Sequence, residues 1–133
     1  MPSESEENYL RALWKLSGGP EQWIATGKLA DRVGVSHPSA TRMAGRLGDQ
    51  GWVEHEPYRG VRLTATGREL AIQTVRRHRI LESYISTILG VPWDQVDAEV
   101  ERLEHAVSDD LICRMEEALG FPARDPHGSP IPD

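Results

Sequence analysis

The sequence has little cysteine and no long apolar stretch. Cys113 is the only cysteine in 133 residues, so a disulfide framework and a Cys-rich zinc site are excluded within one chain. No apolar run approaches the roughly 18 residues that a transmembrane helix needs, and the acidic residues 1–7 lack the apolar core of a secretory signal. We therefore expect a protein of the reducing cytoplasm with no membrane partner. Cys113 is expected in the core.

Positive charge is outnumbered by negative charge in the whole chain but is concentrated in its middle. The formal net charge is −6, which by itself argues against nucleic-acid binding. Residues 1–7 and 94–117 are acidic, whereas residues 28–79 hold Lys28, Arg32, Arg42, Arg46, Arg59, Arg62, Arg68, Arg76, Arg77 and Arg79. A basic surface in this middle segment can bind phosphate despite the acidic total.

The first half of the chain has the pattern of a winged helix-turn-helix. An apolar face predicts a helix over residues 8–16, and a second helix, capped by Thr26 and ended by Gly34, follows a short extended segment. Ser36 or His37 is the expected cap of a third helix, since Pro38 suits a first helical turn. Residues 51–53 and 61–64 are expected to begin and complete a hairpin around a turn at residues 55–60. This order of elements is that of a winged helix-turn-helix.

The second half is expected to be entirely helical. Helices are predicted from Thr64 to about Leu89, from a cap at Asp94 to about Val107, and from a cap at Ser108 to about Leu119. They carry more apolar side chains than so small a domain can obviously bury, which favours a homodimer. The fold class is therefore mainly α, with a winged helix-turn-helix DNA-binding domain in residues 1–65, an all-helical dimerisation domain in residues 66–120 and a Pro/Gly-rich tail or linker in residues 121–133.

The third predicted helix carries the main candidates for contacts with double-stranded DNA. In a winged helix this element enters the major groove, and its first residues reach the base edges. Arg42 suits a guanine or a phosphate, and Pro38 suits a thymine methyl. The other candidates are polar or basic side chains of the second helix, the third helix and the hairpin: Ser36, Ser39, Thr41, Arg46, Lys28, Tyr58, Arg59 and Arg62. The alternative is a solvated surface on a winged helix that binds protein.

Carboxylates and imidazoles recur at helical spacing in the second half. Glu101, Glu104 and His105 are spaced i, i+3 and i+4 and fall on one helical face. Carboxylates at this spacing repel each other by a few tenths of a kcal/mol, which a divalent cation would offset. His78 and Glu82 are likewise i, i+4 on the preceding helix. The alternative is an ordinary intrahelical pair on a solvated helix, so spacing alone leaves metal binding open.

Several segments, in order along nearly the whole chain, resemble the DtxR/MntR family of metal-activated repressors. They are Asn8-Tyr-Leu-Arg11, Ser36-His-Pro-Ser-Ala-Thr41, Tyr58-Arg-Gly60, Leu63-Thr-Ala-Thr-Gly67, Arg77-His-Arg-Ile-Leu-Glu82 and Glu101-Arg-Leu-Glu-His-Ala-Val-Ser108. The resemblance implies a winged helix joined to a helical metal-binding and dimerisation domain. It also implies that metal fixes the relative position of two recognition helices in a dimer on an operator.

The resemblance also implies a set of metal ligands. Glu101, Glu104, His105 and His78 match ligand positions, and Glu82 and Asp97 match an ancillary site of the iron-responsive branch. Two positions depart from the family pattern. Asn8 stands where the family has Asp or Met, and Arg11 stands where the manganese branch has a glutamate ligand, which puts a binuclear site in doubt. Glu7 is a possible substitute donor beside Asn8.

The donor types favour a hard metal ion. Oxygen and imidazole donors, with no thiolate among them, suit Mn²⁺ first and Fe²⁺ second, while Zn²⁺ or Co²⁺ could bind in vitro. The sequence thus predicts a metal-activated repressor of metal-homeostasis genes. The alternatives are a metal-independent winged-helix regulator, whose site has decayed through Asn8 and Arg11, and a metal-dependent hydrolase. Iron-branch members continue through a Pro-rich linker into an SH3-like domain, and this sequence stops where that linker would begin.

Overall fold

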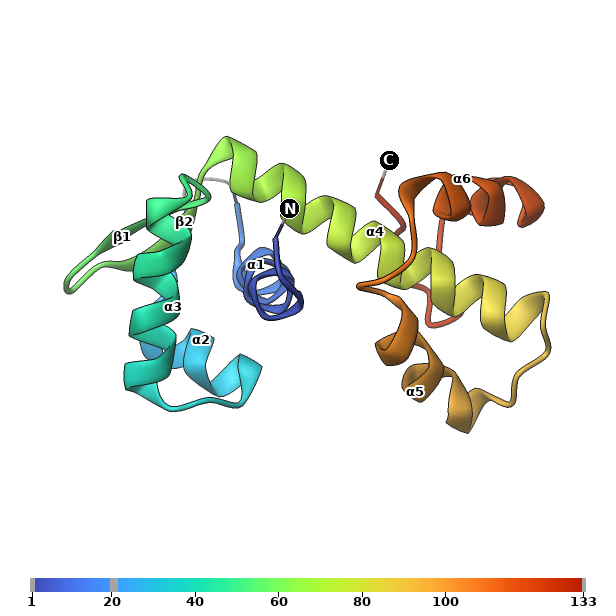
Figure 1. Cartoon of the computed structure of the whole chain (residues 1–133), viewed down its shortest axis with the longest axis horizontal. Coiled ribbons are helices and arrows are strands. Elements are labelled where there is room, and N and C mark those ends of the chain that lie inside the picture. Colours follow the sequence, from blue (N-terminus) through green and yellow to red (C-terminus); the bar gives the residue numbers. More distant parts are fainter. Residues whose placement is uncertain (1, 20–21, 133) are drawn as a thin grey trace. The chain divides into compact units, whose positions relative to one another are not determined.

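The computed structural model describes residues 2–19 and 22–132. Contacts divide the chain into two compact units, Met1–Ile72 and Gln73–Asp133. The first unit holds α1 (Glu4–Leu16), α2 (Thr26–Val33), α3 (His37–Asp49), β1 (Val53–Glu56) and β2 (Gly60–Leu63), and α4 (Ala65–Thr87) begins in it. The rest of α4, with α5 (Trp93–Leu103) and α6 (Asp109–Ala118), belongs to the second (Figure 1). The prediction of a mainly α chain with a winged helix-turn-helix at its start is confirmed.

Helix α1 begins earlier than residue 8, where the prediction placed its start. Ser3 and Glu6 form a capping box: the Ser3 hydroxyl accepts a hydrogen bond from Glu6 N at 3.2 Å, and the Glu6 carboxylate accepts one from Ser3 N at 2.9 Å. Glutamates in the first turn also complement the positive end of the helix dipole. The apolar pattern starts only at Tyr9, so periodicity alone missed this polar first turn.

The helix-turn-helix is formed by α2 and α3, joined at a left-handed glycine. Gly34 has φ 74°, as the prediction of a glycine C-cap requires. Ser36 caps α3, because its hydroxyl accepts a hydrogen bond from Ser39 N at 3.2 Å, and Pro38 lies in the first turn. The predicted cap of α2 is wrong: Ala25 occupies the N-cap position without a side-chain hydrogen bond, and Thr26 is the first helical residue.

The wing is a two-stranded antiparallel hairpin with a short third segment beside it. Val53 pairs with Leu63 and Glu56 with Gly60, so β1 extends further than the predicted start at residues 51–53. Ile24 adds an isolated bridge to Val61, with both of their backbone hydrogen bonds at 2.8 Å. This bridge joins the segment before α2 to the outer edge of β2.

Each unit has its own apolar core. The first is built on residues of α1–α3 and the wing, with Leu10, Leu13, Leu29, Leu47 and Val61 among its fully buried side chains. The second collects Ile80, Leu81, Ile85, Val96, Val100, Ile112 and Ile131. Cys113 is exposed, so its expected place in the core is wrong. Its neighbour Ile112 takes the buried position on α6, and one residue further along turns the side chain by about 100°.

Helix α5 both begins and ends earlier than predicted. Pro92, and not Asp94, is the N-cap, and the helix ends at Leu103, with Glu104 as its C-cap, instead of reaching Val107. Ser108 caps α6 as predicted, because its hydroxyl accepts a hydrogen bond from Leu111 N at 3.1 Å.

Among the described residues, no helix combines the length and the apolar character needed to span a membrane.

The Pro/Gly-rich tail packs onto the second unit over its described residues; Asp133 lies outside them. Asp125 N donates to Ser129 O and Ile131 N donates to Ala123 O, both at 2.9 Å. Asp125 and Ile131 are buried, at 8% and 9% exposure. Its composition suggested a linker, but these hydrogen bonds give residues 123–131 a fixed turn.

Gly67 marks a close approach between the start of α4 and the segment that joins α3 to β1. A Cβ at this position would lie 1.8 Å from the Trp52 carbonyl oxygen. We expect Gly67→Ala to lower the free energy of unfolding by at least about 2 kcal/mol, because the backbone must shift. The matched control is Gly45→Ala on α3, where nothing lies within 4 Å of the added Cβ. This control should be neutral or stabilising by up to about 1 kcal/mol. Urea unfolding measures both, and equal stability of the two variants would contradict the close approach.

Candidate metal centre and nucleic-acid interface

A buried carboxylate between two imidazoles forms the centre of the second unit. Glu104 has a side chain only 4% exposed and lies where α5 ends. One of its oxygens, Oε2, lies 2.5 Å from His78 Nδ1 on α4, and the other, Oε1, lies 3.2 Å from His105 Nε2. Arg77 Nη1 donates a hydrogen bond to the Glu104 carbonyl at 3.0 Å, which ties the end of α5 to α4.

His78 continues this arrangement toward a second carboxylate. Its Nε2 lies 3.5 Å from Glu82 Oε2, so both ring nitrogens face carboxylate oxygens. A neutral imidazole has only one N–H to donate. A neutral imidazole can therefore donate to only one of the two carboxylates, and a divalent cation bound by these groups would accept the lone pair of its other nitrogen.

Glu82 brings the tail into the same array. His127 Nδ1 lies 2.9 Å from Glu82 Oε1, and ligand atoms of Glu82, Asp125 and His127 all lie within 4.8 Å of one another. Burial by itself would raise the pKa of the Glu82 carboxyl, but hydrogen bonds with His78, His127 and Asp125 outweigh it and hold that pKa below its ordinary value. Glu82 is therefore an anionic donor at neutral pH.

Neighbouring groups hold the tail donors in place. The Asp125 carboxylate accepts a hydrogen bond from Ser129 N at 2.8 Å, and the His127 ring packs on Trp93 with ring centroids 4.5 Å apart. Donors fixed in this way lose little freedom when they bind an ion. Sequence reasoning missed Asp125 and His127. The signal was present in Asp125-Pro-His-Gly128, two donors separated by a rigid proline, but the Pro/Gly content was interpreted only as a linker.

The structure brings together only part of the predicted ligand set. His78, Glu82, Glu104 and His105 adjoin one another as described above. Glu101 and Asp97 are exposed on α5, and Asp97 is outside the group that Glu82 forms with the tail.

The predicted donors of the first helix lie in the first unit. The Asn8 carboxamide oxygen accepts a hydrogen bond from Arg11 Nη2 at 3.2 Å, so the two departures from the family pattern pair with each other. Glu7, the predicted substitute donor, is buried at 6% exposure.

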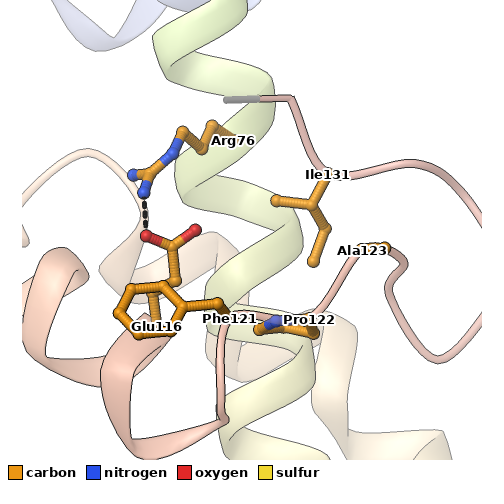
Figure 2. Close-up of a pocket in the computed structure, with 6 residues that line it drawn as sticks. All are labelled: Arg76, Glu116, Phe121, Pro122, Ala123 and Ile131. Carbon is orange, nitrogen blue, oxygen red and sulfur yellow. Dashed lines mark hydrogen bonds and ion pairs between the residues drawn. The ribbon is translucent and has the colours of Figure 1, made fainter.

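A pocket of about 540 Å³ lies elsewhere in the second unit. Figure 2 shows the ion pair of Arg76 with Glu116 on one side of it and Phe121, Pro122, Ala123 and Ile131 around the rest. Its single carboxylate is paired with an arginine, and the other lining groups are mostly apolar. This pocket is therefore not a second metal centre.

The start of α3 presents Arg42 to solvent. Ser36 Oγ lies 2.9 Å from Ser39 Oγ, and the latter accepts a hydrogen bond from Arg42 Nη2 at 3.2 Å. Thr41 donates to the His37 carbonyl at 3.1 Å. Local hydrogen bonds thus engage these hydroxyls, and Pro38, Thr41 and Arg42 are all exposed. Arg42 keeps most of its N–H groups for a base edge or a phosphate.

The remaining predicted DNA contacts lie around α3. Arg46 has a side chain 61% exposed, and its Nε lies 3.6 Å from the buried Glu6 carboxylate, which links α3 to α1. Lys28 is exposed on α2. Tyr58, with φ 70°, is fully exposed at the tip of the wing, next to Arg59. The basic and polar candidates therefore line the helix-turn-helix and its wing.

Comparison with known proteins identifies both halves of the chain. A family model described as "Iron dependent repressor, N-terminal DNA binding domain" matches residues 1–61. Another, described as "Iron dependent repressor, metal binding and dimerisation domain", matches residues 64–133. The chain belongs to the iron-dependent repressor family. The resemblance to DtxR/MntR proteins is thereby confirmed. This family consists of DNA-binding transcriptional repressors and not of enzymes, so the hydrolase alternative is dropped.

The similar proteins are described with different metals. The iron-dependent repressor IdeR of Mycobacterium tuberculosis is 33% identical over 131 residues, which are 97% of this chain and 56% of that protein. A manganese-dependent transcriptional repressor in complex with manganese has a TM-score of 0.84 and 44% identity over 96% of this chain and 58% of its own. ScaR with bound Zn²⁺ has a TM-score of 0.83 and 31% identity over 99% of this chain and 60% of its own. This chain thus spans a little over half the length of these relatives.

Proposed function

We propose that this protein is a metal-activated, homodimeric transcriptional repressor of metal-homeostasis genes that acts in the cytoplasm. The carrying observation is the Glu104 carboxylate, buried between His78 and His105 in a chain whose first half is a DNA-binding domain. A buried anion flanked by two imidazoles is a donor set that divalent cations bind. Because these groups remain in place, a metal-independent regulator is not favoured.

Within this proposal, Glu104, His105 and His78 hold one ion, with Glu101 at the exposed edge of α5. Asn8, or Glu7 beside it, is the donor proposed from α1. Glu82, Asp125 and His127 are proposed to hold a second ion, in place of an ancillary pair of Glu82 with Asp97. A bound cation supplies positive charge that offsets the buried carboxylates, whose mutual repulsion otherwise opposes a closed arrangement of the ligands.

Mn²⁺ is the favoured metal and Fe²⁺ the second. The donors are carboxylate oxygens and imidazole nitrogens, without a thiolate, and such donors suit Mn²⁺. The similarity to a manganese-dependent repressor at 44% identity supports Mn²⁺ as the first choice. The similarity to the iron-dependent repressor IdeR supports Fe²⁺ as the second. ScaR was solved with Zn²⁺ and with Cd²⁺, and we expect Zn²⁺ and Co²⁺ to bind this chain in vitro as well.

An exposed apolar surface on the second unit supports the homodimer. Five large apolar side chains expose between 39% and 61% of their surface: Ile88 and Leu89, which follow α4, Trp93 and Leu103 on α5, and Leu111 on α6. Exposed apolar side chains of this size are typical of surfaces that pack against another protein. The match to a dimerisation domain over residues 64–133 supports a second copy of the chain as the partner.

Loss of the central carboxylate should uncouple DNA binding from metal. We expect Glu104→Gln to weaken Mn²⁺ binding by at least about tenfold, because an anionic ligand is lost. It should also abolish the Mn²⁺-dependent gain in affinity for operator DNA. Calorimetry and fluorescence anisotropy in metal-free buffer measure the two effects. Glu99→Gln, which removes an exposed carboxylate paired with Arg102 on the same helix, is the control and should match the wild type. If wild-type protein bound DNA equally with and without Mn²⁺, the proposal would be wrong.

Removing the tail donors Asp125 and His127 should prevent binding of one of the two proposed ions and leave the other bound. The double variant Asp125→Asn, His127→Gln keeps Glu104 and its two histidines, so native mass spectrometry in Mn²⁺ should show one ion fewer per chain. Glu117→Gln, an exposed carboxylate on α6, is the control for charge. An unchanged ion count in the double variant would show that the tail is structural only.

Arg42 should contribute a phosphate or base contact. We expect Arg42→Gln to weaken binding of Mn²⁺-loaded protein to DNA by about 5- to 100-fold. If the contact is to a phosphate, the slope of log K against log salt should also fall by about one. Arg114→Gln removes an exposed arginine paired with Asp110 on α6 and should leave both quantities unchanged. If Arg42→Gln and Arg114→Gln weakened DNA binding equally, the loss would reflect the change in net charge and not a contact made by Arg42.

A further inference from the structure

Trp23 lies against two arginines of the wing. It precedes Ile24, whose backbone pairs with Val61, and this pairing places Trp23 beside the next residue of β2, Arg62. The Arg62 guanidinium carbon lies 4.6 Å from the centre of the indole ring, and that of Arg59 lies 5.2 Å from it. Both guanidinium groups therefore lie within the range of cation–π attraction to one indole ring.

The two arginines are held differently. Arg62 has a side chain only 22% exposed and forms an ion pair of 2.7 Å with Glu54, its cross-strand neighbour on β1. Arg59 has a side chain 62% exposed, and its Nη1 lies 3.5 Å from Glu56 Oε2. Arg62 is thus fixed in the sheet, while Arg59 faces solvent near the tip of the wing.

Stacking on the ring leaves Arg59 able to bind an anion. A guanidinium stacks through its flat face, and its N–H groups point outward around its edge. Arg59 can therefore keep its contact with Trp23 while donating to a phosphate oxygen. Without the ring, a long flexible side chain in a hairpin turn would have to be ordered when DNA binds, which weakens binding.

We propose that Trp23 is a positioning residue for DNA binding. The indole ring orders the Arg59 guanidinium so that its N–H groups can donate to a backbone phosphate. Arg62, which forms an ion pair with Glu54, contacts the same ring and fixes its position relative to β2. The inference rests on the proposed function as a DNA-binding regulator. It gives a role in that function to an uncharged side chain outside the recognition helix, which the sequence pattern did not single out.

The test compares Trp23→Leu with Trp23→Phe in the full chain loaded with Mn²⁺. A labelled mixed-sequence duplex suffices as the probe, because the contact is to phosphate, and anisotropy at several salt concentrations gives affinity and salt slope. We expect Trp23→Leu to weaken binding by about 3- to 10-fold, and Trp23→Phe by less than about twofold, since a phenyl ring retains the cation–π contact. Unchanged affinity in Trp23→Leu would overturn the inference.

A double-mutant cycle separates positioning from a purely structural role. In an Arg59→Gln background, which should itself lower the salt slope by about one, Trp23→Leu should cause no further loss of affinity. The same loss in both backgrounds would mean that Trp23 supports only the fold. If Trp23→Leu unfolds, Arg59→Lys takes its place: it keeps the charge, loses planar stacking and should weaken binding about threefold, whereas wild-type affinity would overturn the inference. Failure of the wild type to bind DNA would instead refute the proposed function.

Discussion

The contact of the buried Glu104 carboxylate with His78 and His105 is the constraint on which the second unit depends. It joins the middle of α4 to the end of α5, and Arg77 reinforces the same junction by binding the Glu104 carbonyl. A carboxylate this deeply buried is costly unless it is compensated by positive charge or hydrogen bonds. The fold thus concentrates negative charge where a cation can offset it, and local stability and metal binding become linked.

His78 extends this link beyond a single site. Its two nitrogens face Glu104 and Glu82, and Glu82 in turn meets His127 and Asp125 of the tail. The His78 imidazole therefore lies between the two proposed ion positions, so occupancy of one changes the charge that the other experiences. The tail takes part through its own hydrogen bonds and the packing of His127 on Trp93.

In the first unit, the side chains proposed to contact DNA are held in place by a different means. Ser36, Ser39 and Arg42 are ordered by local hydrogen bonds at the start of α3, Arg46 by the buried Glu6, and the wing arginines by Trp23. Backbone contacts set the position of the wing itself, through the Ile24–Val61 bridge and the close approach of Gly67 to Trp52. Preorganisation of this kind lowers the entropy lost when long side chains bind an extended polyanion.

The sequence by itself determined the order of helices and hairpin, the Ser108 cap and the family, and it narrowed the cap of α3 to Ser36 or His37. It also indicated Glu104, His105, His78 and Glu82 as candidate donors, because helical spacing and capping are local properties. It could not place the end of α5, the early start of α1 or the exposed position of Cys113, where packing and polar caps overrode apolar periodicity. Only the tertiary structure showed that Glu104 is buried between two histidines while Glu101 is exposed. Only it brought Asp125 and His127 to Glu82, and Trp23 to Arg59 and Arg62. Asp125 and His127 are far from Glu82 in the sequence, as Trp23 is from Arg59 and Arg62, while Glu101 and Glu104 are close in sequence but differ in burial. Such relations are set only when the chain folds.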